Sequence, residues 1–296
     1  MRTVDVRPFD EADRPRVPEA DRRPAACFVA ETDGRIVGWA QAAHARWQFH
    51  PDKYWMRLEV QPDCRRQGTG RILLGRILDE LHDLDALLVR TIAIDGDEDT
   101  TGFLGRRGFG EVWRNVESRL DVASFDPAPF AEVVGRLEVQ GVTITTMAED
   151  LAGGHDRFAT VYDLYVSTNS DQASLDPVTP PPLEEFVSDV TFEPRGMLDA
   201  WFLALAGDRL VGVSTLERLG FSTDTLETGY TGVDREHRGR GIALALKVRA
   251  IAYARDNGYR FIQTDSSSTN DRMLAINAAL GFVPTSTRIT YELGLR

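Results

Sequence analysis

The feature that most constrains the fold is a motif that occurs twice. In each copy an apolar strand-like segment leads into a basic turn and then a helix-like apolar pattern; the copies run from Val60 to Gly70 and from Val233 to Ala243. The turn residues are Arg65, Arg66, Gln67, Gly68, Thr69 and Gly70 in the first copy and Arg238, Gly239, Arg240, Gly241, Ile242 and Ala243 in the second. This layout places unpaired backbone N–H groups at a helix N-terminus, where a pyrophosphate can bind. A purely structural tight turn is the alternative for each copy.

The two copies keep a nearly constant spacing. Val60 and Val233 are 173 residues apart, as are Gly68 and Gly241, and Gly108 and Gly281. We therefore predict an internal duplication that gives two domains of similar topology. The Pro-rich stretch at 126–129 marks the connection between them. The predicted division is a domain over 1–124, a bridging helix over 125–140 and a second domain over 141–296.

Segments whose apolar residues recur with the period of a β-strand alternate along both halves with segments that have the period of an α-helix. They predict an α/β (α+β) fold with mixed sheets flanked by helices. We expect helices over 68–82, 98–107, 130–140, 155–168, 183–190, 241–256 and 270–280. We expect strands over 3–7, 27–31, 35–42, 54–60, 87–94, 111–120, 142–147, 200–206, 209–217, 226–233 and 259–265, and a last strand that ends near 293. The helices over 155–168 and 183–190 would form a wall for a second substrate that the first domain lacks.

The net charge of the chain limits the classes of partner that it is expected to bind. The formal net charge of −12 argues against nucleic acid as a generic partner. Residues 1–124 hold 19 basic and 22 acidic side chains, which leaves 15 basic and 24 acidic side chains for the rest of the chain. The more acidic second half would favour a cationic ligand, although an ordinary solvated acidic surface has the same composition.

Other classes of protein are disfavoured by composition. No apolar run is long enough to span a bilayer, and the N-terminus lacks the apolar stretch of a signal peptide. Cys27 and Cys64 lack metal-like spacing and are interpreted as reduced thiols of a cytoplasmic protein. His237 in the basic turn is interpreted as a surface residue, and the other four histidines, His44, His50, His82 and His155, form no metal-like cluster. We therefore expect no metal, no membrane association and no nucleic acid.

The repeated turn also resembles a known family. The pattern Arg/Gln-x-x-Gly-x-Gly/Ala, each time after a strand that ends in Val, resembles the GNAT superfamily of N-acetyltransferases, and the resemblance covers nearly the whole chain as two tandem domains. Two such domains in tandem resemble the architecture of mycothiol synthases. The resemblance implies acetyl-CoA as co-substrate, in a cleft where the fourth and fifth strands separate. It implies that the amides of 239–244 hold the pyrophosphate and that the Val233 main chain pairs with the pantetheine arm, with 66–71 and Val60 as the counterparts.

Acetyl transfer to an amine needs a proton acceptor. An alkylammonium with a pKa of about 10.4 leaves only about one part in 10³ as free amine at neutral pH. In some members of the superfamily a Glu six residues before the motif Val is the general base, and that position is Glu227 here but Tyr54 in the first copy. Asp265 is a second carboxylate near the implied cleft. An exposed carboxylate at a strand end is the alternative for Glu227.

The chain lacks the residue that protonates the leaving thiolate in many members of the superfamily. Those members place a Tyr acid four residues before a Gly-Phe pair, whereas this chain has Leu104 and Asn277 at these positions. Asn277 could donate a hydrogen bond to the sulfur, or it could only cap or pack. Asn270 could anchor the cofactor arm, but its default role is to cap the next helix.

These observations predict a cytoplasmic N-acetyltransferase. The second domain would move acetyl from acetyl-CoA to a primary amine of a small molecule, by direct attack in a ternary complex, because no Cys lies in the second half to carry the acyl group. The first domain would be a degenerate scaffold, and the protein a monomer or homodimer. One alternative is a non-catalytic acyl-CoA-binding sensory or scaffold protein. Another is transfer of an aminoacyl or long acyl group on the same fold.

Overall fold

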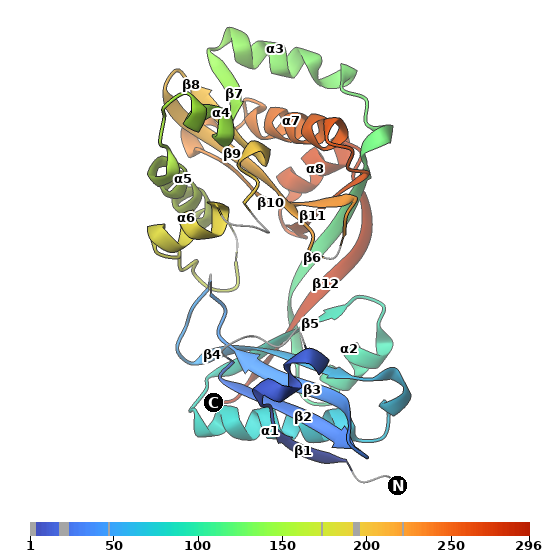
Figure 1. Cartoon of the computed structure of the whole chain (residues 1–296). Helices are drawn as coiled ribbons and strands as arrows, with labels where there is room; N and C mark the ends of the chain where they lie inside the picture. Colours follow the sequence, from blue (N-terminus) through green and yellow to red (C-terminus); the bar gives the residue numbers. More distant parts are fainter. Residues whose placement is uncertain (1–3, 18–23, 47, 173, 192–195, 221) are drawn as a thin grey trace. The chain divides into compact units, whose positions relative to one another are not determined.

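The computed structural model describes residues 4–17, 24–46, 48–172, 174–191, 196–220 and 222–296 (Figure 1). The chain divides into two compact units. The first comprises Met1–Trp113 together with Arg288–Arg296, and the second comprises Arg114–Thr287.

The sheet of the first unit has the strand order β1-β2-β3-β4-β5-β12. Its strands are β1 (Asp5–Pro8), β2 (Ala26–Thr32), β3 (Arg35–Ala43), β4 (Lys53–Val60), β5 (Leu88–Ile94) and β12 (Val283–Gly294), and its helices are η1 (Glu11–Arg16), η2 (Pro62–Cys64), α1 (Thr69–Asp83) and α2 (Glu98–Gly105). The apolar stripe of α1 contributes Leu73, Ile77 and Leu81, each with no exposed surface, to the core under the sheet. This burial explains why the 3.6-residue period over 68–82 predicts the helix correctly.

The sheet of the second unit has the order β6-β11-β10-β9-β8-β7. Its strands are β6 (Gly110–Asp121), β7 (Val142–Thr146), β8 (Trp201–Ala206), β9 (Arg209–Arg218), β10 (Thr225–Val233) and β11 (Phe261–Ser267). Its helices are η3 (Val122–Ser124), η4 (Ala128–Phe130), α3 (Ala131–Val139), α4 (Met147–Ala152), α5 (Phe158–Ser170), α6 (Leu183–Thr191), η5 (Leu198–Ala200), η6 (Arg235–His237), α7 (Ile242–Asp256) and α8 (Asp271–Ala279). One core lies under α3, α7 and α8, and another lies under α5 and α6 on the opposite face (Figure 1).

The last strands of the two halves are exchanged. By chain order β6 closes the first half, but its Asn115–Asp121 segment pairs antiparallel with β11. The Arg288–Gly294 part of β12, which closes the second half, pairs antiparallel with β5. The compact units therefore divide the chain near 113 and 287, whereas the sequence places the boundaries at 124 and 141. The physical reason is that a strand belongs to the sheet whose backbone donors and acceptors it satisfies.

Most predicted elements agree with the structure within a few residues. An unexpected element is α4, although Thr146 and Glu149 form a capping box at its start, with Glu149 N donating to Thr146 Oγ1 at 3.1 Å. That Thr-x-x-Glu signal is readable in the sequence. Between the first and second strands, the second unit has α4, α5 and α6, whereas the described residues of the first unit have only η1 there. The two helices predicted over 155–168 and 183–190 are thus present as α5 and α6.

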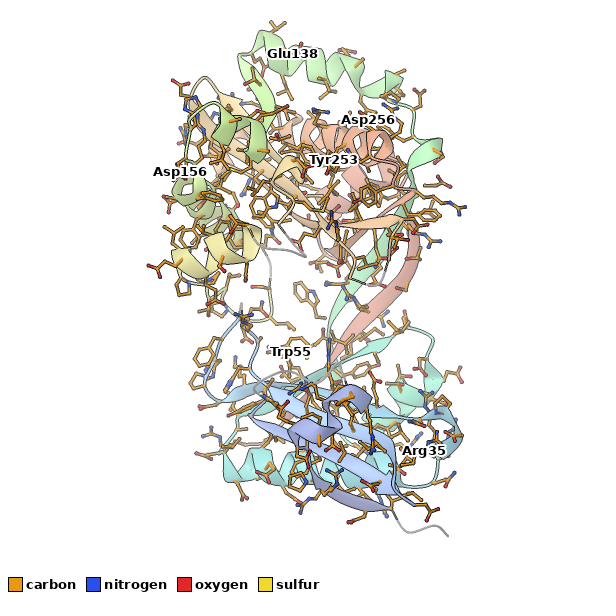
Figure 2. The ribbon with its side chains drawn as sticks, viewed as in Figure 1. Arg35, Trp55, Glu138, Asp156, Tyr253 and Asp256 are labelled. Atoms are coloured by element: carbon orange, nitrogen blue, oxygen red, sulfur yellow. The ribbon has the colours of Figure 1, made fainter. Side chains whose placement is uncertain are left out.

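The repeat also holds at the level of side chains. Arg35 at the start of β3 (labelled in Figure 2) bonds to Gln61 and to Asp63, the latter at 3.0 Å. In the second unit Arg209 at the start of β9 bonds to Asp234 at 2.8 Å. Each arginine thus ties the start of one strand to the turn that follows the next. Within the described residues, no helix is both long enough and apolar enough to cross a membrane.

Candidate active site

Two neighbouring parallel strands separate in each unit. In the second unit β10 and β11 pair only from Thr225–Glu227 against Phe261–Gln263, although β10 continues to Val233. In the first unit β4 and β5 pair only from Lys53–Trp55 against Leu88–Arg90. Beyond these pairs the facing edges carry backbone groups without a partner in the neighbouring strand, so an extended ligand could pair there.

The repeated turns have the same backbone path. Gly241 precedes α7 with φ 92° and Gly68 precedes α1 with φ 95°. Two residues earlier, Gly239 has φ 77°, whereas the first copy holds Arg66 at φ 62°. The left-handed conformation costs a residue with a Cβ about 1–2 kcal/mol relative to glycine. The second copy therefore adopts this path with less strain than the first.

Each turn is held by one arginine. Arg238 Nε donates to the carbonyl of Val233 at 2.9 Å, and Arg65 Nε donates to the carbonyl of Val60 at the same distance. The Arg238 side chain therefore braces the turn, and the main-chain amides are left to bind a ligand. Within the described part of the turn, the amides of 239–241 make no hydrogen bond to protein. Such amides at a helix start fit a diphosphate.

The surroundings of the two turns differ. Asp171, just past α5, accepts from Arg238 Nη2 at 2.8 Å and from Arg235 Nη2 at 2.5 Å, so both arginines hold its pKa below the usual value. On α3, Val133 lies so close that a Cβ added to Gly241 would be 2.5 Å from its Cγ1. In the described part of the first unit, no atom beyond the two chain neighbours lies within 4 Å of such an atom on Gly68.

The other predicted turn residues have distinct positions. Ile242 and Thr69 open their helices with 2% exposed surface each, so they offer main-chain amides and not side chains to a ligand. Gln67 Nε2 donates to the carbonyl of Asp63 at 3.2 Å, and Arg240 Nη2 to that of Glu236 at 3.4 Å. Gly70 lies against Phe103, while Ala243 packs partly buried against the core of the second unit.

A bulge in β10 shapes the separated region of the second unit. The register between β9 and β10 shifts between Thr228 and Tyr230, and Tyr230 N donates to Thr215 Oγ1 at 3.0 Å. A Cβ on Gly229 would overlap the carboxylate of Glu217. Glycine at the bulge therefore lets the Glu217 side chain cross the β10 backbone.

Glu227 precedes this bulge and is half-buried. It lies opposite Glu217 in the antiparallel ladder and beside Gln263 in the parallel one. Residues opposite each other share a face of the sheet, so Glu227 and Glu217 lie on the face covered by α5 and α6. Asp265, two residues past Gln263, lies on this face as well. The structure thus brings two predicted carboxylates to one face and adds Glu217, which the sequence analysis missed.

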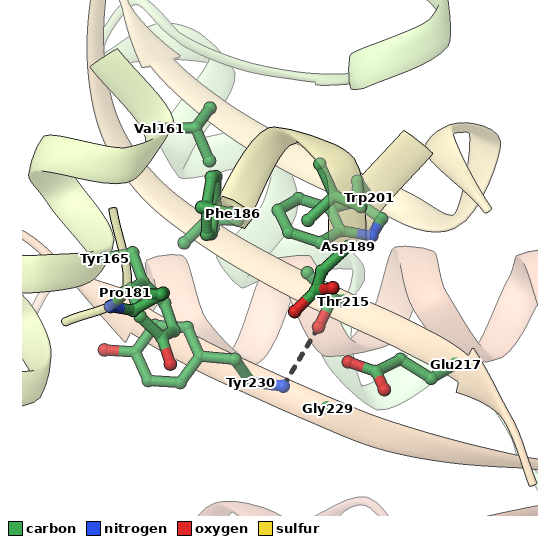
Figure 3. Close-up of a pocket in the computed structure, with 12 residues that line it drawn as sticks. Val161, Tyr165, Pro181, Phe186, Asp189, Trp201, Thr215, Glu217, Gly229 and Tyr230 are labelled. Atoms are coloured by element: carbon green, nitrogen blue, oxygen red, sulfur yellow. Dashed lines mark hydrogen bonds between the residues drawn. The ribbon is translucent and has the colours of Figure 1, made fainter. Parts of the chain in front are cut away.

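A pocket of about 150 Å³ lies on this face (Figure 3). Its walls come from α5, α6 and the segment before α6, and its floor comes from β8, β9 and β10. The lining residues are Val161, Tyr165, Pro181, Phe186, Asp189, Val190, Trp201, Val213, Thr215, Glu217, Gly229 and Tyr230. The alternation along β9, which places Val213, Thr215 and Glu217 on one face, is a sequence signal that could have located Glu217.

Two tyrosines in this wall are held in the neutral form. Burial raises the pKa of Tyr230 to about 12, and its hydroxyl lies 2.6 Å from Thr168 Oγ1 on α5. Burial and the negative charge of Glu217 raise the pKa of Tyr165. Both phenols therefore stay protonated at neutral pH.

The remaining predicted residues have structural partners. Asp265 accepts from Asn115 Nδ2 of β6 at 3.0 Å. Asn270 caps α8, accepting from Met273 N at 3.2 Å, so its default role is the observed one. Asn277 is 3% exposed and donates to Ser266 Oγ at 3.3 Å, while its Oδ1 has no partner within the described residues. The amide of Asn277 is thus used inside the contact between α8 and β11.

A buried cation lies on the opposite side of the sheet from the pocket. Lys247 of α7 is 3% exposed, and its Nζ lies 5.5 Å from the ring centre of Phe282. Burial lowers the pKa of Lys247 to about 8. The position had no functional prediction, because a Lys in an amphipathic helix is expected on its solvent face.

One group of side chains has the spacing of metal ligands. Atoms of Asp234, Glu236 and His237 lie within 4.8 Å of one another. Arg209 already donates to Asp234 at 2.8 Å and to Glu236 at 3.4 Å. A guanidinium in that place supplies the positive charge that a metal ion would bring, so this group does not fit a metal centre.

Similarity to known proteins covers both copies of the motif. The model of the acetyltransferase (GNAT) family matches residues 3–109 and 158–282. A mycothiol acetyltransferase of Actinosynnema mirum is 25% identical over 274 residues, which cover 91% of this chain and 84% of that protein.

Two solved structures share the fold over nearly the whole chain. A GCN5-related N-acetyltransferase from Sphaerobacter thermophilus superposes with a TM-score of 0.75 at 17% identity, covering 99% of this chain and 96% of that one. A tandem GNAT protein from the clavulanic acid biosynthesis pathway superposes with a TM-score of 0.74 at 19% identity, covering 99% of both chains. The chain therefore has a tandem, mycothiol-synthase-like architecture.

Proposed function

The chain belongs to the acetyltransferase (GNAT) family, and on that premise we propose that its second unit transfers an acetyl group from acetyl-CoA to the primary amine of a small molecule. As a family member it is an acyl-CoA-dependent N-acetyltransferase with acetyl-CoA as co-substrate. The observation that carries the assignment to the second unit is the position of Glu227. It lies where β10 leaves β11, on the same face as the pocket.

The turn before α7 fits the diphosphate of acetyl-CoA. The amides of Gly239, Arg240 and Gly241 have no hydrogen-bond acceptor among the described residues, and those of Ile242 and Ala243 open the helix. Val233 would offer its strand edge to the pantetheine arm. When bound, acetyl-CoA supplies the thioester as acyl donor. Arg238 would keep the turn in place through the carbonyl of Val233.

The amine must lose a proton before it attacks. We propose that the Glu227 carboxylate accepts this proton. General base catalysis of this kind commonly raises the reaction rate 10²–10⁴-fold. No Cys lies beyond Cys64 to carry the acyl group, so the amine attacks directly in a ternary complex.

In this chain Asn277 occupies the position where many superfamily members have the tyrosine that protonates the departing thiolate, so the thiolate receives no proton from that position. Its Nδ2 already donates to Ser266, so we propose that Asn277 orients β11 beside the cleft. A thiol pKa near 8.5 makes the thiolate a tolerable leaving group. Asp265, held by Asn115, would contribute charge to the cleft and not proton transfer.

The first unit is proposed to be a scaffold. It repeats the turn from Arg65 to Gly70, and it could still bind the cofactor there. It has Tyr54 in place of Glu227, and its described residues provide no counterpart of α5 and α6. We place the reaction in the cytoplasm, where Cys27 and Cys64, neither of which forms a disulfide within the described residues, would stay reduced. A monomer or a homodimer is compatible with this arrangement.

Thiol release from acetyl-CoA in the presence of a panel of primary amines tests the proposal. We expect turnover with at least one small amine and intersecting double-reciprocal lines, as a ternary complex requires. Parallel lines would contradict direct attack. Tight binding of acetyl-CoA without release for any amine would instead support the acyl-CoA-binding sensor, which the missing Tyr acids at Leu104 and Asn277 favour.

A further inference from the structure

The proposed reaction leaves the buried ammonium of Lys247 without a role. Lys247 is 3% exposed, and burial is the sole cause that lowers its pKa, to about 8, so no hydrogen-bond or ion-pair partner among the described residues contributes. Its Nζ lies 5.5 Å from the ring centre of Phe282. A buried ammonium without a paired charge is costly to the fold. The position of this group therefore calls for an explanation.

The helices α7 and α8 place this cation over the gap between β10 and β11. α7 lies over β9, since a Cβ added to Gly212 would be 2.9 Å from Ile242 Cγ2. α8 lies against β11, where Asn277 Nδ2 donates to Ser266 Oγ at 3.3 Å. In the sheet β10 lies between β9 and β11. The space between the two helices therefore lies over β10 and over the edge where it leaves β11.

The Lys247 side chain extends into this space. Leu246 packs toward β9, where its Cδ1 would be 3.2 Å from a Cβ on Gly212. Lys247 follows it by about 100° around the helix axis, so it lies on the flank of α7. Its ammonium reaches Phe282, whose N–H donates to the carbonyl of Asn277 at 3.0 Å. Lys247 thus meets the same end of α8 that carries Asn277.

Asn277 gives an independent indication that this space receives a ligand. Its side chain is buried, and its Oδ1 has no partner within the described residues. Its other partner, Ser266, lies three residues beyond Gln263, the last residue of β11 that pairs with β10. Buried polar atoms without a partner are rare. A donor that enters the gap between the strands would satisfy this one.

We infer that Lys247 is the general acid of the transfer and gives a proton to the sulfur that leaves acetyl-CoA. The inference rests on the proposed function and adds the proton donor that it lacks. The C–S bond breaks with its electron pair on sulfur, and the sulfur takes a proton from Lys247 Nζ. The neutral lysine regains a proton from water after the thiol departs. The proton of the attacking amine goes separately to Glu227.

The proton affinities of the two groups are matched. A thiol has a pKa near 8.5, and the pKa of Lys247 is about 8, so transfer between them is close to balanced. A general acid is most effective when its pKa lies near the pH at which it works. A lysine with the ordinary pKa of 10.5 would be an acid about 300-fold weaker. The face of the Phe282 ring favours the charged form until the proton leaves.

The acid and the base lie on opposite faces of the sheet. Glu227 is on the face covered by α5 and α6, whereas Lys247 belongs to α7 on the other face (Figure 1). A thioester held in the gap between β10 and β11 would meet the amine on the first face and release its sulfur toward the second. The two proton transfers are thereby kept apart.

The test compares the binding of CoA and of desulfo-CoA, which lacks the sulfur. Calorimetry on the full chain at pH 8 measures both affinities without turnover. We expect CoA to bind about tenfold more tightly, because an ammonium beside the sulfur favours its thiolate form. Lys247→Met should bring the ratio of the two affinities toward one. Arg249→Met, which removes a charge from the exposed side of the same helix, should preserve the ratio.

Thiol release gives the second measurement. Lys247→Met should lower turnover about 10²-fold, at the low end for general acid catalysis, because a thiolate departs without full protonation. The Kd for desulfo-CoA should change less than twofold. Melting of the variant checks that it folds, and Arg249→Met should keep the turnover of the wild type.

The outcomes separate this inference from the proposed function. An affinity ratio that survives Lys247→Met would overturn the inference, whatever happens to turnover, because the lysine would then not meet the sulfur. A ratio lost in Lys247→Met with turnover unchanged would also overturn the acid role. Acetylation of an amine by the wild type would leave the proposed function standing in both cases. Absence of thiol release from the wild type with every amine would overturn the proposed function and the acid role together.

Discussion

Glu217 and Glu227 lie directly opposite each other on β9 and β10, one residue before the strand ladder is interrupted by the bulge at Gly229. A carboxylate at the place where β10 leaves β11 suits the role of proton acceptor for an ammonium.

Replacement of Glu227 by Gln should lower turnover about 10²-fold at pH 7 while changing the Kd for acetyl-CoA less than twofold. The loss should shrink as the pH approaches 10, because the amine then deprotonates in solution. Thiol-release rates across pH and calorimetry with acetyl-CoA measure both effects. Glu138→Gln on α3 is the matched control. A loss that is constant with pH would contradict the assignment of Glu227 as base.

Replacement of Gly229 by Ala should displace the Glu217 carboxylate, since the new methyl group would occupy its position. We propose that Glu217, which lines the pocket, attracts the ammonium of the acceptor, so KM for the amine should rise about tenfold with a smaller change in kcat while Glu227 stays. Gly220→Ala is the control, because no described residue beyond its chain neighbours would lie within 4 Å of the new methyl group. If Gly229→Ala left KM unchanged, Glu217 would not contribute to amine binding.

The two cap glycines should differ in their tolerance of alanine. Gly68→Ala and Gly241→Ala both place a Cβ in the left-handed region, which costs about 1–2 kcal/mol. At Gly241 the methyl group also meets Val133, so we expect an additional loss of about 1 kcal/mol. Calorimetric melting of both variants measures the difference. The double variant Val133→Ala/Gly241→Ala should recover the additional part, and failure to recover it would show that Val133 is not the obstacle.

Replacement of Lys247 by Met should stabilise the protein below pH 8. The folded-state pKa of about 8 lies below the ordinary value of 10.5, so the buried charge destabilises the fold below pH 8 by about 3 kcal/mol. Between pH 8 and 10.5 the unfolded chain binds more protons, and wild-type stability rises with pH. The gain from Met should therefore vanish near pH 10.5. Urea unfolding at pH 7 and 10 checks this, and a gain independent of pH would contradict it.

Local sequence determined the elements that carry the motif. The apolar periods located α1 and α7 within a residue of their observed ends, and the glycine turns lie directly before both helices. The signal is strong because helix period and turn composition depend on residues a few positions apart. The separation of β10 from β11 was expected only from the family resemblance, because it depends on pairing between strands more than 30 positions apart.

Tertiary structure alone decided the parts that depend on distant residues. The exchange of β6 and β12 cannot be read from either strand, because each could satisfy its backbone groups on either sheet. Glu217 lies beside Glu227 because of the register between β9 and β10. Val133 lies beside Gly241 because of the way α3 packs. By itself the sequence determined which segments form the two glycine turns that are proposed to hold the cofactor, since that information is local. Which side chains line the pocket proposed for the acceptor was decided by long-range packing, because those residues come from elements tens of positions apart.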